Sequence, residues 1–100
     1  MEVRIATTKD VPSGKIRGIE SNGKSILVAN LNGKYYAIGN ICTHAGCTLS
    51  DGTLNGEKVR CLCHGSTFDI RTGKVLKGPA NDPEPSFNLR IDGEQILVSM

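Results

Sequence analysis

The sequence has no tryptophan and only four other aromatic residues, so its core has to be mostly aliphatic. It has no apolar run that resembles a signal peptide. Its longest uninterrupted apolar stretch, Ile26 to Ala29, is far short of the roughly 20 residues that a membrane-spanning helix needs. The net charge is small too, at +2, because the chain has 12 basic and 10 acidic residues, which are scattered along it. These absences predict a soluble, cytoplasmic protein without a membrane anchor or a nucleic-acid-binding surface.

Helical periodicity is also absent, since no 11-residue window repeats its apolar residues every 3.6 positions between a cap and a stop signal. The chain has instead 12 glycines placed between short runs of strand-forming residues. Asn32-Gly33 and Asp92-Gly93 each separate two such runs, which predicts tight hairpins because these residues tolerate positive φ. The fold class predicted for the single domain, residues 1–100, is all-β: an antiparallel sandwich or small barrel of about eight to ten short strands.

The expected strands are short and lie between the glycine turns. Pro79, Pro83 and Pro85 lie close together and predict an ordered loop rather than a central strand. Strands are expected at 2–6, 24–29, 34–38, 57–61, 67–71, 74–76, 87–91 and 94–99, and Thr53-Leu-Asn55-Gly56 before residue 57 repeats the Asn-Gly turn arrangement.

All four cysteines and both histidines lie between residues 42 and 64. They form two motifs, Cys42-Thr-His44-Ala-Gly-Cys47 and Cys61-Leu-Cys63-His64, each in a glycine-containing turn that follows an expected strand. Such turns suit metal-binding loops, because backbone amides can point at bound sulfur and a missing Cβ lets the chain pass close. The spacing therefore points to a metal centre.

Three interpretations of these residues stay open on spacing alone. In the first, two cysteines are small core side chains, as is common for free cysteine, the other two have no particular role, and the two histidines lie on the surface. A Cys₂His₂ zinc site is the second, although zinc motifs usually pair two cysteines and two histidines at separate short spacings. The third, which we favour, is a two-iron, two-sulfide cluster with two thiolates on one iron and two imidazoles on the other.

The motifs Cys42-Thr-His44 and Cys61-Leu-Cys63-His64-Gly65-Ser66, supported by Gly78-Pro79-Ala80, resemble the cluster-binding motifs and the proline loop of the Rieske family. The likeness extends over about residues 34–98 and is closest to soluble ferredoxins of the disulfide-containing type. It implies a Rieske-like sandwich with a small cluster-binding subdomain of two loops, about residues 41–80. One [2Fe-2S] cluster per chain is implied, with Cys42 and Cys61 on the inner iron and His44 and His64 on the outer, more exposed iron.

The resemblance also implies a disulfide between Cys47 and Cys63, because Rieske proteins with this six-position pattern join the two corresponding cysteines. Two free thiols are the alternative. A disulfide is unusual in a cytoplasmic protein, and we expect the surrounding loops to shield it. It would hold the two loops together and limit their movement during electron transfer.

The ligand set raises the reduction potential, because exchanging two of four thiolates for neutral imidazoles removes two negative charges from the centre. Ser66 is expected to raise it further by donating a hydrogen bond to a cluster sulfur. Phe68 departs from the higher-potential members, which have a tyrosine there. We therefore expect a potential below that of respiratory Rieske proteins and above that of ferredoxins lacking both Ser66 and the disulfide. Gly78 and Pro79 are expected to cover the cluster and exclude water.

The sequence contains no nucleophile–base pair and no nucleotide-binding loop. The expected ligands also fill every iron position, so we predict an electron carrier rather than an enzyme. Redox partners are expected to dock at the His44/His64 end of a monomer. The first hypothesis is a ferredoxin between a reductase and a terminal oxidoreductase such as an oxygenase. The alternatives are a soluble domain or subunit of a quinol-oxidising complex, and a regulatory subunit with a structural cluster.

Overall fold

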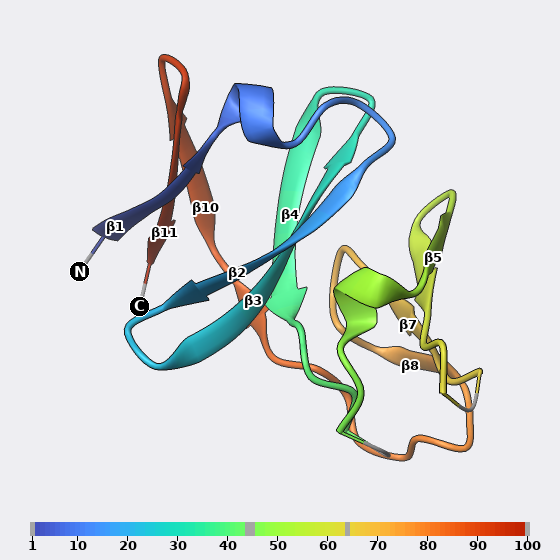
Figure 1. Ribbon diagram of the computed structural model, residues 1–100. Helices are drawn as coiled ribbons and strands as arrows, with labels where there is room; N and C mark the ends of the chain where they lie inside the picture. Colours follow the sequence, from blue (N-terminus) through green and yellow to red (C-terminus); the bar gives the residue numbers. More distant parts are fainter. Residues whose placement is uncertain (1, 44–45, 64, 100) are drawn as a thin grey trace.

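The computed structural model describes residues 2–43, 46–63 and 65–99, which form eleven strands in three antiparallel sheets (Figure 1). This confirms the predicted all-β class, and the eleven strands are one more than the upper end of the expected eight to ten. No helix in these ranges is long and apolar enough to cross a membrane. The strands are β1 (Glu2–Thr7), β2 (Ile16–Ser21), β3 (Lys24–Leu31), β4 (Lys34–Gly39), β5 (Thr53–Asn55), β6 (Lys58–Arg60), β7 (Thr67–Asp69), β8 (Val75–Lys77), β9 (Ser86–Phe87), β10 (Leu89–Asp92) and β11 (Gln95–Ser99), with short 3-10 helices η1 (Thr8–Asp10) and η2 (Leu49–Asp51).

The three sheets divide the molecule into a base and a smaller unit beside it. The base consists of the sheets β1-β11-β10 and β2-β3-β4-β9. The third sheet, β5-β6-β7-β8, lies at the other end of the molecule and belongs to the segment expected to bind the cluster (Figure 1). We call it the cluster sheet.

The Asn-Gly turns form as predicted. Asn32 and Gly33 both have positive φ between β3 and β4, and Gly93 has positive φ between β10 and β11. A third turn of this kind, Asn22-Gly23, joins β3 to strand β2, which the sequence analysis missed.

One predicted strand is wrong. Residues 87–91 are divided at Asn88, because β9 pairs with β4 whereas β10 pairs with β11. The carbonyl of Asn88 accepts a hydrogen bond from the Ser99 amide, 3.0 Å, at the change of sheet. Ile91 is accordingly 41% exposed and does not continue a buried face.

Strand β3 is buried on both faces and separates two cores. Ile26 and Val28 face the core between the two base sheets, whereas Leu27 and Ala29 face a core under the cluster sheet. This explains why its sequence is a continuous aliphatic run rather than an alternation. The second core also contains Cys42, Cys61 and Phe68, so two of the expected ligands lie on a packed aliphatic floor.

Candidate metal centre

The two cysteine loops repeat the same hydrogen bonds. The amide of Cys42 donates to the carbonyl of Cys47 at 2.7 Å, and the amide of Cys61 donates to the carbonyl of Ser66, five residues on, also at 2.7 Å. The carbonyls of Cys42 and Cys61 each accept an amide four residues on, from Gly46 and Gly65, and both glycines have positive φ. The loops therefore place Cys42 and Cys61 at equivalent positions.

Cys47 and Cys63 form a disulfide with a Cα–Cα distance of 6.4 Å, which confirms the expected pairing. It closes a loop with a sequence separation of 16 residues, for which loop-closure entropy predicts a stabilisation of about 3 kcal/mol. The Sγ atoms of Cys47, Cys61 and Cys63 lie within 4.8 Å of one another. Because two of them are bonded together, this group offers one thiol rather than three.

Cys42 and Cys61 are the free cysteines and are 2% and 1% exposed. Their buried thiols, on two matching loops joined by a disulfide, fit one iron of a [2Fe-2S] centre. The expected ligands His44 and His64 lie outside the described residues, so their role stays a prediction.

Ser66 joins the proline loop to the second cysteine loop. It is fully buried, and its Oγ accepts a hydrogen bond from the amide of Ala80, 3.0 Å. No hydrogen bond from this hydroxyl to another described residue is present, so among these residues its hydrogen stays available to donate, as a bond to a cluster sulfur would require. The adjacent Gly78–Pro79 peptide is cis, and Pro79 itself is exposed. That this segment covers the cluster stays a prediction.

Replacing Ser66 with alanine is expected to lower the reduction potential, because a hydrogen bond to sulfur stabilises the more negative, reduced cluster. A bond that is stronger by roughly 1.4 kcal/mol in the reduced state corresponds to about 59 mV for one electron. Phe68→Tyr should raise the potential, because it adds a hydroxyl donor to the core that holds Cys42 and Cys61, in which Phe68 is fully buried. Voltammetry at fixed pH checks both. Thr67→Ala, which removes a hydroxyl that donates to the Gly65 carbonyl, is the control, and equal shifts in all variants would contradict the assignment.

Glu84 is a buried carboxyl that the sequence analysis missed. It is 4% exposed, and its Oε2 accepts a hydrogen bond from the amide of Thr43, 3.1 Å, between the expected ligands Cys42 and His44. Burial raises the pKa of Glu84 to about 7, although the Thr43 hydrogen bond partly opposes the rise. The Thr43 hydroxyl donates to the carbonyl of Asp82, 2.7 Å. The segment 82–84 therefore holds the first cysteine loop at its middle.

Two glycines make room for Glu84. A Cβ on Gly39 would overlap the carboxylate Oε1, and a Cβ on Gly73 would overlap the backbone carbonyl oxygen of Glu84. The Glu84 amide donates to the Gly73 carbonyl, 2.8 Å, and so ties the turn between β7 and β8 to the same segment. Nothing in the local sequence Pro83-Glu84-Pro85 signals this burial, because the surrounding residues are distant in the chain.

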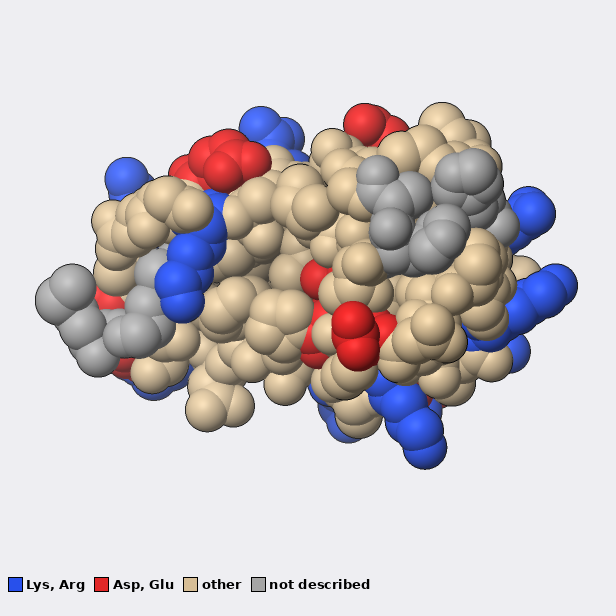
Figure 2. All heavy atoms as spheres, turned by 90° about the horizontal axis from the view of Figure 1, so that it is seen from below, with Lys and Arg blue, Asp and Glu red and all other residues tan. Residues whose placement is uncertain are grey.

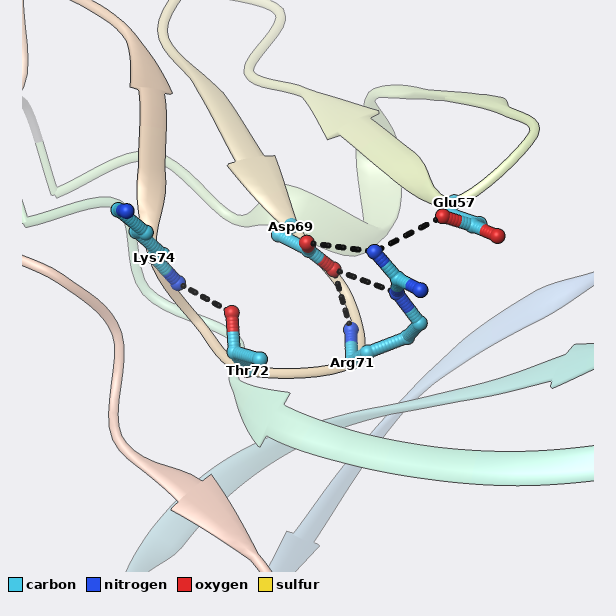
Figure 3. Close-up of polar contacts among 5 residues, drawn as sticks. All are labelled: Glu57, Asp69, Arg71, Thr72 and Lys74. Atoms are coloured by element: carbon cyan, nitrogen blue, oxygen red, sulfur yellow. Dashed lines mark hydrogen bonds and ion pairs between the residues drawn. The ribbon is translucent and has the colours of Figure 1, made fainter.

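Arg71, which follows β7, links the end of that strand to the turn between β5 and β6 (Figure 3). Its Nε and Nη2 donate to the two carboxylate oxygens of Asp69 at 3.3 and 3.2 Å, and Nη2 lies 3.0 Å from Oε2 of Glu57. Burial alone would raise the pKa of Asp69, but the hydrogen bonds from Arg71 outweigh it and hold that pKa below its ordinary value. Asp69 is therefore an ionised group whose two oxygens both accept hydrogen bonds from Arg71.

The family model of the Rieske [2Fe-2S] domain matches residues 1–90. The chain is 34% identical over 95 residues to the ferredoxin component of the naphthalene 1,2-dioxygenase/salicylate 5-hydroxylase systems of Ralstonia sp., covering 95% of this chain and 91% of that protein.

Among solved structures, the ferredoxin of carbazole 1,9a-dioxygenase from Nocardioides aromaticivorans IC177 superposes with a TM-score of 0.93 at 31% identity, covering 99% of this chain and 97% of that one. A chain from a complex of reduced oxygenase and oxidized ferredoxin in carbazole 1,9a-dioxygenase superposes with a TM-score of 0.91 at 27% identity, covering 98% of this chain and 92% of that one.

Proposed function

The chain belongs to the Rieske [2Fe-2S] domain family, and from this premise we propose that it carries single electrons to a terminal oxygenase. The observation that carries the proposal is its likeness, over nearly the whole length of both chains, to the ferredoxin component of an oxygenase system. The bound [2Fe-2S] cluster supplies a centre that accepts and releases one electron. The relatives favour the oxygenase system over the quinol-oxidising alternative.

We propose that Cys42 and Cys61 hold one iron and that His44 and His64 hold the other. The buried positions of the two free thiols on matching loops support the first pair. Because histidine has a second ring nitrogen, His44 and His64 would each hold a proton whose affinity depends on the charge of the iron. All iron positions would then be filled by the protein, which suits electron transfer rather than chemistry on a substrate.

The loops limit movement around the proposed ligands. The Cys47–Cys63 disulfide joins one loop to the other, Glu84 holds the first loop at Thr43, and Ser66 joins the second loop to Ala80. A site held at these points changes little in shape when its charge changes by one. This supports a rigid carrier.

We propose that the redox partner docks at the His44/His64 end of a monomer that works in the cytoplasm. Leu62, beside the expected ligand Cys61, is 72% exposed, and Pro79 of the expected proline loop is also exposed. A small apolar contact of this kind suits a brief encounter with an interface below about 1,200 Å². A complex of ferredoxin with oxygenase in a similar protein is the precedent for such docking.

Absorption and EPR spectra of the purified protein, oxidised and reduced by dithionite, test the cluster. We expect reversible bleaching, with two irons and two sulfides per chain as the cluster formula requires. His44→Ala and His64→Ala should each lose iron and the redox signal. A colourless protein with one tightly bound zinc would overturn the proposal.

Electron delivery is tested by mixing the reduced protein with two acceptors. The terminal oxygenase of carbazole 1,9a-dioxygenase should reoxidise it faster than cytochrome c does. Preference for cytochrome c would instead favour the quinol-oxidising alternative.

A further inference from the structure

The net charge of the protein lies in the segment that contains the cluster sheet. Residues 40–80 carry five basic and three acidic side chains, whereas the rest of the chain carries seven of each. Seen from below, Lys and Arg atoms project at the end of the molecule that carries the cluster sheet (Figure 2). The overall charge of +2 therefore lies within residues 40–80, because the rest of the chain has no net charge.

Strand register gathers the basic residues on the outer face of the cluster sheet. Arg60 lies opposite Thr67, and Thr67 lies opposite Lys77, so one row crosses three strands. Lys58 and Arg60 lie on the same face of β6, because the residue between them, Val59, is fully buried. With the exposed Leu76, these residues line an open hollow of about 690 Å³ that has no acidic lining residue. We call Lys58, Arg60, Lys77 and Leu76 the basic face.

The cations of the basic face form no ion pair with the acidic residues that the structure describes. Lys58 lies opposite Asp69 in the register, but both oxygens of Asp69 accept hydrogen bonds from Arg71, and Asp69 forms its ion pair with Arg71 (Figure 3). No ion pair among the described residues involves Lys58, Arg60 or Lys77. The face therefore keeps its positive charge for an outside group.

Arg60 connects the basic face to the second cysteine loop. A Cβ built on Gly65 would lie 3.2 Å from Nη2 and 3.3 Å from Nε of Arg60, so the guanidinium lies across this glycine. Gly65 directly follows the expected ligand His64. The positive charge thus begins beside the proposed electron-transfer end and continues along the sheet.

We propose that the basic face is a second part of the docking surface and that it binds a carboxylate-rich patch on the protein redox partner. The proposal rests on the proposed function, since it adds to the same docking end. Complementary charge steers diffusional encounter and orients the partner without requiring tight binding. A protein rather than a nucleic acid is favoured because the face has no aromatic side chain on which bases could stack.

The test measures how fast the dithionite-reduced holoprotein is oxidised in a stopped-flow instrument by two small reagents of opposite charge. Ferricyanide is a trianion and tris(phenanthroline)cobalt(III) is a trication. The variant Lys58→Glu/Lys77→Glu should slow ferricyanide roughly threefold or more at low ionic strength and accelerate the cobalt reagent. High salt should remove both effects. Lys58→Gln/Lys77→Gln should give a smaller change in the same direction.

The matched control is Arg4→Glu/Lys9→Glu, which makes the same change in net charge at the opposite end of the molecule (Figure 1). It should leave both rates nearly unchanged. Poly-L-glutamate, a probe for protein carboxylates, should slow ferricyanide oxidation of the natural protein and of the control but not of Lys58→Glu/Lys77→Glu.

The proposal would be overturned if the control variant changed both rates equally, or if poly-L-glutamate slowed the oxidation of all variants equally. The rates would then depend only on the net charge of the protein. Protection by a DNA duplex without protection by poly-L-glutamate would replace the protein partner with a nucleic acid. If the protein bleaches reversibly but these charge effects are absent, the proposal about the basic face is wrong, whereas the proposed electron-carrier function still holds. A natural protein that never bleaches would defeat the proposed function.

Discussion

Gly73→Ala should destabilise the protein severely, by roughly 3 kcal/mol or more. The residue has a φ of +82°, where a side chain costs about 1–2 kcal/mol. The added Cβ would also overlap the backbone carbonyl of Glu84, which no side-chain rotation can relieve. Moving the two segments apart breaks the hydrogen bond from the Glu84 amide to the Gly73 carbonyl, for about another 1 kcal/mol. Denaturant unfolding of the oxidised holoprotein, followed by circular dichroism, measures the loss.

Gly93→Ala is the matched control for this substitution. Gly93 also has a positive φ, +61°, but its added Cβ would meet nothing within 4 Å. It should therefore show the backbone cost alone, about 1–2 kcal/mol. If both variants lose the same free energy of unfolding, the contact between the β7–β8 turn and the Glu84 segment contributes nothing.

Glu84→Gln should stabilise the protein at high pH and leave it nearly unchanged at low pH. The pKa of Glu84 rises from its ordinary value of 4.5 to about 7 on folding, so the folded state binds the proton more tightly. The free energy of unfolding therefore falls as the pH rises from 4.5 through 7, and the full penalty, up to roughly 3 kcal/mol, persists above 7. Glutamine avoids the penalty because it stays neutral and still offers an oxygen to the Thr43 amide.

Thermal unfolding of the two proteins between pH 4 and pH 9 would check this dependence, since their curves should separate progressively as the pH rises from 4.5 to 7 and stay at a constant distance above 7. Glu20→Gln, which makes the same chemical change on the exposed strand β2, should have no such effect. Destabilisation of Glu84→Gln at every pH would show that the carboxylate is required in its ionised form.

The hairpin turns could be predicted from the sequence because each depends on adjacent residues. The metal-binding motifs could be recognised because their cysteines and histidines are closely spaced. The Asn32-Gly33 turn requires positive φ at two adjacent residues, and few residue types provide it. Strand β2 ends at the same kind of signal, Asn22-Gly23, but it lies at the edge of its sheet and is largely exposed. Its residues therefore show no alternation of apolar and polar side chains, and the strand was missed.

The division of residues 87–91 could not be predicted, because Phe87 and Leu89 alternate in sequence as they would in one strand. Only their partners, Ala37 on β4 and Val98 on β11, show that they belong to different sheets.

Within the site, long-range contacts set the limit of prediction. The Cys47–Cys63 pair could be expected because the two motifs resemble those of the Rieske family, whereas the burial of Glu84 depends on Gly39, Thr43 and Gly73. In the same way, the sequence shows only that Lys58 and Arg60 alternate with the apolar Val59, as on any strand with one face in solvent. The charges of Lys58 and Arg60 stay unpaired because of the register across β6, β7 and β8, and because Asp69 pairs with Arg71.

The pairing of β1 with β11 places Glu2 beside Ser99, so the described chain starts and finishes at neighbouring points, away from the cluster sheet (Figure 1). A short peptide could therefore join these points, and the backbone could be reopened at the exposed Asn22-Gly23 turn, which likewise lies in the base. Such a circular permutant would keep every strand pair, both cysteine loops and the disulfide. A partner domain fused at the base would thus lie away from the cluster sheet.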